Sequence, residues 1–294
     1  MVGIKFIYIN MVYEWLRYIF KEFLMKCVIN IISLVFILVL SACGGENMSE
    51  KINFQNIDNK ISIEEINNIS SKKIYFGHQS VGFNILDGVE DLLKENQGAQ
   101  LNIIKSRNAS VFEKPVFAHS PIGENSDPEL KLMDFKNAID NGIGQHVDIA
   151  FMKFCYLDIN KTTDIEKVFS IYKKTFETLK KENPDTVFAH VTVPLTLSEF
   201  TIKSLIKKIL GKKDNNIMRK KFNDKLISEY AGKDPIFDLA KVESTYPDGN
   251  VSSFTENGES YYSLAPEYAA DNGHLNELGR RIAAKEFIKF LSDI

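Results

Sequence analysis

From Lys72 to Ile294 the sequence alternates short apolar runs with longer segments of helical periodicity. The apolar runs are typical of strands buried on both faces of a sheet. The segments between them have the dozen or more residues needed to cross from one strand to a parallel neighbour. This pattern predicts one α/β domain, a three-layer α/β/α sandwich with a mostly parallel sheet.

The spacing of apolar residues predicts a strand or a helix for each of these segments. Apolar residues along the last predicted helix indicate that it packs on the sheet through Leu278, Ile282, Phe287 and Leu291. Residues 107–127 show no clear periodicity and are predicted to form a long loop. The predicted strands are 72–77, 100–106, 147–159, 186–194 and 235–240, and the predicted helices are 80–96, 128–142, 163–183, 216–232 and 276–294.

The N-terminal region reads as an export signal. Met25–Cys43 has a lysine, a short apolar run and the ending Leu-Ser-Ala-Cys, which indicates a signal peptide within residues 1–43 and a true start at Met25. The ending resembles a bacterial lipobox, in which Cys43 is lipidated and becomes the mature N-terminus. An uncleaved membrane anchor is the alternative. Residues 44–71 are polar and predict a tether with a short helix. We expect an exported lipoprotein anchored to a membrane of the cell envelope.

Charge and cysteine content exclude some classes. The chain has 36 basic and 39 acidic residues, a net charge of −3, so no strong positive field points to a nucleic-acid partner. After the signal only Cys43 and Cys155 remain, which leaves no intramolecular disulfide once Cys43 is acylated. Cys155 lies in an apolar strand without a cationic neighbour in sequence, which favours a structural thiol over a nucleophile.

Two motifs carry the residue types of acyl-transfer chemistry. "FGHQSVG" places Ser80 directly after the first predicted strand, at the edge where parallel sheets build their sites. A serine nucleophile needs a base, and that base needs an orienting acid. "DNGHLNELG" offers Asp271 and His274 on one turn before the last helix. Taken alone, Ser80 is most simply interpreted as a helix N-cap. The Asp271–His274 pair is what favours its interpretation as a catalytic nucleophile.

This arrangement resembles the SGNH/GDSL hydrolase family, in a divergent branch, over residues 72–294. The resemblance implies a nucleophilic Ser80, His274 as general base and acid, Asp271 as its partner, and no cofactor. The chain departs from the family at His78-Gln79-Ser80, where Gly-Asp-Ser is usual, and lacks the Gly-x-Asn-Asp block. We therefore assign the oxyanion hole to Ser80, Gly123 and Asn125.

Other polar residues fall near the expected strand ends. A metal site built from His78, His119, Asp158 and His274 is the alternative use of some of them, but no pair has the helical spacing of a zinc protease, and we expect no metal. The residues expected to line the pocket are His78, His119, Lys153, Tyr156 and Asp158.

The sequence therefore predicts a serine esterase that removes an O-acyl group, such as O-acetyl, from a carbohydrate or another small ester. A monomer is expected. The alternative is a non-catalytic ligand-binding lipoprotein that keeps the same fold, because the missing block weakens the oxyanion hole.

Overall fold

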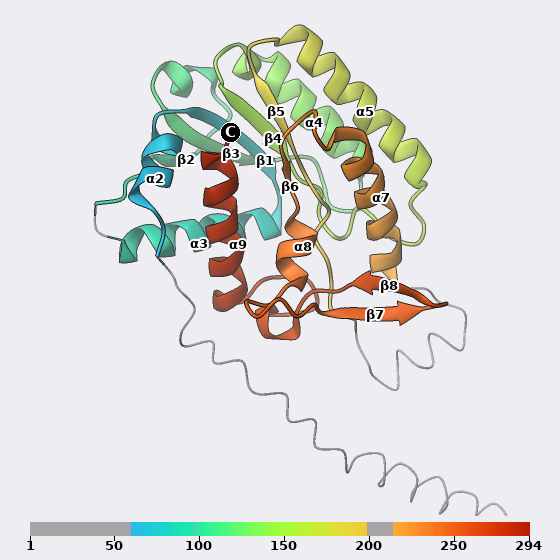
Figure 1. The fold of residues 1–294 in the computed structure, drawn as a ribbon. Helices are drawn as coiled ribbons and strands as arrows, with labels where there is room; N and C mark the ends of the chain where they lie inside the picture. The colour runs from blue at the N-terminus through green and yellow to red at the C-terminus, as the bar shows by residue number, and fades with distance from the viewer. Residues whose placement is uncertain (1–59, 97, 199–213) are drawn as a thin grey trace, which may run out of the picture. The chain divides into compact units, whose positions relative to one another are not determined.

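A parallel sheet is the centre of the computed structural model, which describes residues 60–96, 98–198 and 214–294 (Figure 1). Its strand order is β2-β3-β1-β4-β5-β6, and every neighbouring pair is parallel. The first strand in sequence is thus central, so the loop that follows it opens at the middle of the sheet edge. The strands are β1 (Lys73–His78), β2 (Ile103–Lys105), β3 (Val116–Pro121), β4 (Ile149–Met152), β5 (Val187–Val191) and β6 (Ile236–Phe237).

One face of the sheet is covered by α3 (Ser80–Glu95) and α9 (Glu277–Ser292), which lie side by side. The ring of Phe287 on α9 is buried against the strands. It packs against one phenylalanine from each of four strands, and this spread fixes α9 across the middle of the sheet. The four partners are Phe76, Phe117, Phe151 and Phe237, at centroid distances of 5.7, 6.1, 5.8 and 5.3 Å.

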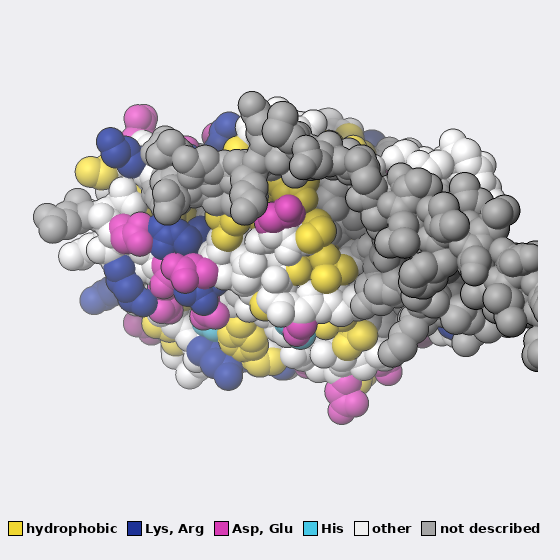
Figure 2. Space-filling view, turned by 90° about the horizontal axis from the view of Figure 1, so that it is seen from below, with side chains coloured by type: hydrophobic (Ala, Val, Ile, Leu, Met, Phe, Trp, Pro, Cys, Tyr) yellow, Lys and Arg dark blue, Asp and Glu magenta, His cyan; other side chains and the backbone are white. Residues whose placement is uncertain are grey.

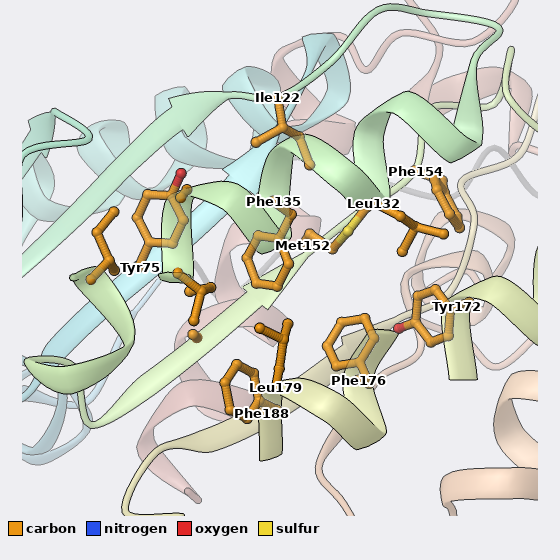
Figure 3. Packing of buried hydrophobic residues seen from close by; sticks show 14 of the residues in the cluster. Tyr75, Ile122, Leu132, Phe135, Met152, Phe154, Tyr172, Phe176, Leu179 and Phe188 are labelled. Carbon is orange, nitrogen blue, oxygen red and sulfur yellow. The ribbon is translucent and has the colours of Figure 1, made fainter. Parts of the chain in front are cut away.

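The opposite face is covered by α4 (Pro128–Asp140), α5 (Ile165–Glu182) and α7 (Asn215–Tyr230). Figure 3 shows the aromatic and aliphatic side chains that fill this layer. Tyr75 of β1 stacks on Phe135 of α4, and Phe135 stacks in turn on Phe176 of α5. With helices on both faces, the predicted three-layer α/β/α fold is confirmed.

The folded domain begins earlier than residue 72. Helix α2 (Ile63–Ser70) starts with a capping box between Ser62 and Glu65. Its Ile66 and Ile69 are fully buried, and α2 packs beside α9. The end of the predicted tether is therefore part of the domain. Residues 44–59, Cys43 and the predicted signal lie outside the described residues.

Two strand regions were not expected from the sequence. β3 lies in the predicted loop 107–127, where only three apolar residues follow Pro115 and precede polar ones. The hairpin of β7 (Ser253–Glu256) and β8 (Glu259–Tyr262) was also missed. Its turn holds Asn257 and Gly258 with φ of 53° and 83°, the Asn-Gly signature of a tight hairpin. The remaining short elements are η2 (Ala109–Glu113), η3 (Ile143–Gln145), α8 (Leu239–Ser244) and η4 (Pro266–Tyr268).

The buried stripe of α9 differs from the predicted one. Phe287 and Leu291 are buried as expected, but Leu278 and Ile282 are only half-buried. The reason is the close approach of α3, where a Cβ on Gly88 would lie 2.3 Å from the Arg280 carbonyl oxygen. The face of α9 toward α3 must therefore carry small residues, and the buried set is Gly279, Ala283, Ala284, Phe287, Ile288 and Leu291.

Among the described helices, we find none with the length and apolar character required to cross a membrane.

Replacing Phe287 by alanine should destabilise the domain strongly. The ring is 1% exposed and contacts four strands, so its loss leaves a cavity that the sheet cannot close. We expect the free energy of unfolding to fall by about 3–5 kcal/mol, measured by urea denaturation. Lys289→Ala, at an exposed position of the same helix, is the control. Equal unfolding midpoints for the two variants would contradict this placement of α9.

Candidate active site

Ser80 is the first residue of α3 and follows β1 by one residue. Gln79, between them, occupies the N-cap position but does not cap the helix with its side chain. Its Nε2 donates instead to the carbonyl oxygens of Ile122 and Gly123, both at 2.9 Å. The start of α3 is thus tied to the loop after β3. The Gln79 side chain does not compete for the first backbone N–H groups, which are the groups that bind developing negative charge at a helix N-terminus.

Asp271 and His274 form a closed turn just before α9. Asp271 Oδ2 lies 2.7 Å from His274 Nδ1, and Oδ1 accepts from the N–H groups of Gly273 and His274, both at 2.9 Å. These contacts, that with the Gly273 N–H first, lower the pKa of Asp271 to about 2. The carboxylate is therefore ionised at neutral pH, holds the proton on Nδ1, and leaves Nε2 as the basic atom of the ring.

Asn84 brings the turn to the start of α3. Its Oδ1 accepts from the Leu275 N–H at 3.2 Å, across 191 residues of sequence. Asn84 lies one helical turn after Ser80, so both belong to the same side of α3. No hydrogen bond between described residues joins the Ser80 hydroxyl to His274, and such catalytic bonds often tighten only when substrate is bound.

The side of the molecule where α9 begins is seen in Figure 2. Hydrophobic side chains gather in the middle of its described part, and most of the Lys and Arg side chains in view lie to the left.

Gly123 does not offer the donor expected from the sequence. Its N–H donates to Asp134 Oδ2 at 2.8 Å, and Asp134 also pairs with Arg107 at 2.9 Å. Its φ is 47°, and a Cβ there would lie 2.8 Å from the backbone of Lys131. Gly123 is therefore needed for a close turn against α4, and its N–H is already taken.

Asn125 keeps its donor groups. Its Oδ1 accepts from Lys131 Nζ at 2.9 Å, which fixes the orientation of the amide. Nδ2 donates to no described residue, and Asn125 is exposed. Its role in the oxyanion hole stays a prediction.

Asp158 lies beneath the site loops, not in the wall of a pocket. It is 1% exposed and accepts from Lys131 Nζ at 2.7 Å, from the Ser126 N–H at 2.8 Å and from the Cys155 N–H at 2.6 Å. Lys131 is fully buried too. The ion pair joins α4 to the loop after β4, and the Ser126 N–H bond ties the loop after β3 to the same carboxylate.

His78 and His119 are buried as a pair. His78 Nε2 lies 2.9 Å from His119 Nδ1, and His78 Nδ1 lies 3.0 Å from the Gln79 carbonyl oxygen. A Cβ on Gly82 would lie 2.3 Å from the His78 ring, so α3 starts directly on top of it. Burial lowers the pKa of His78 to about 3 and that of His119 to about 4. Both are neutral supports under α3, in place of the pocket lining expected for them.

Lys153 is also inside the fold. It is 1% exposed, and its Nζ donates to the Phe154 carbonyl oxygen at 3.0 Å. Burial lowers its pKa to about 8. Cys155, two residues on, is buried. No group of three or more potential metal ligands was found among the residues that the structure describes.

Tyr156 is the predicted pocket residue that lies against the turn. Its ring is 5.6 Å from the His274 ring, edge to face, and it remains partly exposed. Sequence reasoning missed three residues that position the site: Gln79, Asn84 and Arg219, whose guanidinium holds the Tyr156 carbonyl. Asn84 could have been found from its four-residue spacing to Ser80. Nothing in the sequence pairs residue 219 with residue 156.

A separate surface hollow of about 580 Å³ lies between the start of α5 and α7. Its lining contains none of the predicted site residues, and Lys225 and Glu166 within it pair with each other at 2.9 Å. We assign it no role in the chemistry.

No family model matches this chain, and neither does any curated protein. Among solved structures it is similar to a Streptococcus pneumonia protein provisionally named a platelet activating factor, at 14% identity over 78% of this chain and 89% of that one, with a TM-score of 0.46. A provisionally named acylhydrolase from Bacteroides fragilis is 14% identical over 81% and 98% of the two chains, with a TM-score of 0.43. The periplasmic domain of a lipopolysaccharide acetyltransferase from Salmonella ser. Paratyphi A is 15% identical over 73% and 81%, with a TM-score of 0.42.

The buried histidines should make the fold sensitive to acid. An unfolded histidine has a pKa of about 6.5, whereas His119 in the fold has a pKa of about 4. Between these values the unfolded state binds more protons, so the free energy of unfolding should fall as pH falls. The slope is up to about 1.4 kcal/mol per pH unit for each such histidine. His78 adds to it down to pH about 3.

His119→Gln should flatten this dependence between about pH 6.5 and 4, as measured by urea denaturation across that range. His146→Gln is the matched control, because it removes an exposed histidine and leaves the pair intact. A slope in His119→Gln equal to that of the parent would contradict a neutral buried pair.

Proposed function

We propose that this chain is a serine esterase that removes an O-acyl group from a small ester through an acyl-Ser80 intermediate. The observation that carries the proposal is the hydrogen bond from the Leu275 N–H to Asn84 Oδ1. It holds the Asp271–His274 turn against the first turns of α3, the helix on which Ser80 is the first residue. This contact supports a joint role for the proposed nucleophile, base and orienting acid at one edge of the sheet.

Each group has one task in the reaction. His274 Nε2 takes the Ser80 proton as Oγ attacks the acyl carbon. Asp271 keeps Nδ1 protonated and stabilises the imidazolium that forms. The alkoxide leaves with the proton from His274, and water then attacks the acyl-enzyme in the same way. The Ser80 N–H at the start of α3 and the Asn125 amide are the proposed donors to the oxyanion. No cofactor takes part in these steps.

The substrate class follows from the surface around the site. Hydrophobic and uncharged side chains make up most of the middle of the face in Figure 2, with a few Asp or Glu side chains beside them and most of the Lys and Arg side chains to the left. This surface favours a neutral ester such as an O-acetylated carbohydrate. The lipobox-like ending at Cys43 supports a further proposal, that the enzyme is exported and tethered to a membrane by an N-terminal lipid. It would then work on esters of the cell envelope as a monomer.

The three site residues should behave as one unit. Ser80→Ala and His274→Ala should each abolish nearly all hydrolysis of a short-chain nitrophenyl ester, and the double variant should be little worse than either. Asp271→Asn should lose much but not all activity, because the amide favours the wrong tautomer of His274. The measurements are kcat and KM for the nitrophenyl ester and for acetylated sugars, with folding checked by circular dichroism.

Asp87→Asn, at an exposed position of α3, is the control for changes on that helix. Labelling of Ser80 by a fluorophosphonate gives an independent readout. A folded Ser80→Ala with the parent's rate would reduce Ser80 to a helix cap. A parent chain that neither hydrolyses esters nor is labelled, yet binds an acetylated sugar, would instead be the non-catalytic ligand-binding lipoprotein.

Changing Cys43 to alanine should release the protein from the membrane fraction or stop its processing. The reason is that a cysteine thiol is required for lipid attachment, and one N-terminal lipid group is what anchors the chain. The measurement is fractionation followed by intact-mass analysis, with Ser49→Ala, also outside the described residues, as the matched control. Normal processing and membrane association of Cys43→Ala would show that the lipobox interpretation is wrong.

A further inference from the structure

The turn that carries His274 is shaped around the ring of Tyr156. A Cβ on Gly273 would lie 2.6 Å from Tyr156 Cε1 and 2.7 Å from Cζ, closer than Cβ atoms approach other heavy atoms in proteins. The Tyr156 ring also meets the His274 ring at 78°, with centroids 5.6 Å apart. Glycine at 273 thus lets the phenol end of Tyr156 come directly against the turn.

Arg219 of α7 holds the backbone of Tyr156 in place. Its Nε and Nη2 donate to the Tyr156 carbonyl oxygen at 3.0 and 2.7 Å, and its guanidinium lies 5.8 Å from the centre of the ring. Arg219 is 2% exposed. Its remaining contacts are neutral: Nη1 donates to Asn216 Oδ1 at 2.5 Å and to Thr196 Oγ1 at 2.7 Å. No carboxylate among the described residues pairs with it.

A buried guanidinium without a carboxylate partner is costly, and burial lowers the pKa of Arg219 to about 10. Two of its hydrogen bonds go to one carbonyl, that of Tyr156. This contact fixes the loop after β4 at the point where it meets His274.

The Tyr156 hydroxyl itself has no partner among the described residues. The ring is partly exposed, and its phenol end lies against Gly273 of the turn. Burial raises the pKa of Tyr156, and the phenol therefore keeps its proton at neutral pH. By contrast, the hydroxyls of five other tyrosines are already bonded within the fold: Tyr75, Tyr172, Tyr246, Tyr261 and Tyr268.

We propose that Tyr156 is a catalytic residue, a further side-chain donor to the oxyanion beside the Asn125 amide, and that Arg219 is the positioning residue that sets its place. This inference rests on the proposed Ser80 function. As Ser80 Oγ bonds to the acyl carbon, the carbonyl π electrons move to the oxygen and the serine proton moves to His274 Nε2. The Tyr156 O–H donates a hydrogen bond to that oxygen and keeps its own proton. When the carbonyl re-forms, the bond to the alcohol breaks and His274 protonates the leaving oxygen.

Tyr156→Phe tests the hydroxyl, since the ring and its packing against Gly273 are retained. We expect kcat for a nitrophenyl acetate to fall by about 10²–10³-fold, as for loss of one oxyanion donor, with KM nearly unchanged. Tyr262→Phe removes the hydroxyl of an exposed tyrosine and should keep the parent's kcat. A folded Tyr156→Phe with kcat within about twofold of the parent, or with a change in KM alone, would overturn the proposal.

The role of Arg219 is tested by substituting it both in the parent chain and in the Tyr156→Phe variant. Arg219→Lys should lower kcat in the parent but have little further effect in Tyr156→Phe, because it acts through the hydroxyl that is missing there. An equal loss in both backgrounds would mean a purely structural role. If circular dichroism shows Arg219→Lys unfolded, Arg219→Gln, which keeps a donor amide, replaces it.

The two proposals fail in different ways. An inactive parent whose Ser80 is not labelled by fluorophosphonate removes the esterase and the tyrosine role together. An active parent with Ser80 labelled and an unaffected Tyr156→Phe removes only the tyrosine role.

Discussion

The buried ion pair of Lys131 and Asp158 is the contact on which the arrangement of the site loops depends. Both side chains are withdrawn from water, so neither is tolerated without the other. Asp158 also accepts from two backbone N–H groups, those of Ser126 and Cys155. One carboxylate thus satisfies three donors from α4, from the loop after β3 and from the loop after β4. Such a pair adds little net stability, but losing one partner leaves an unpaired charge in the interior.

From this pair a chain of contacts runs to the base of the proposed reaction. Cys155, held by Asp158, precedes Tyr156, whose carbonyl is fixed by Arg219. The Tyr156 ring fills the space left by Gly273, and the turn there closes on His274. No step in the chain relies on a long flexible side chain at the surface. The geometry of the site is therefore set by groups that have little freedom to move.

The fold class could be predicted because it depends on local patterns. The strands β1 and β4 carry continuous apolar runs, and the helices that follow them in the crossovers, α3 and α5, have apolar residues at helical spacing. β3 was missed because its apolar residues, 116–118, are few and end in His119 and Ser120. Both polar residues are satisfied only by partners distant in sequence, His78 and Tyr75.

The hydrogen-bonded pair of Asp271 and His274 could be predicted from the sequence, but the residues that hold the site in place could not. Asp271 and His274 are three residues apart, so their hydrogen bond follows from local spacing. The prediction that Gly123 has a free N–H was wrong. The acceptor of this N–H is Asp134 on the next helix, and the sequence of the loop does not show that the two are hydrogen-bonded. His78 and Lys153 were expected in a pocket since they are polar and near strand ends. Their burial depends on the packing of α3 and of the loop after β4, which a single sequence does not reveal.

The order of synthesis has a consequence for this arrangement. α9 is the last described helix to be made, and Phe287 fastens it to four strands that were made before it. A growing or truncated chain that stops before α9 carries Ser80 without a docked His274 turn. Ser80, the proposed nucleophile, therefore has no base beside it until α9 is made and docked. Only chains whose domain is complete would then hydrolyse esters, and partly made chains would be inactive.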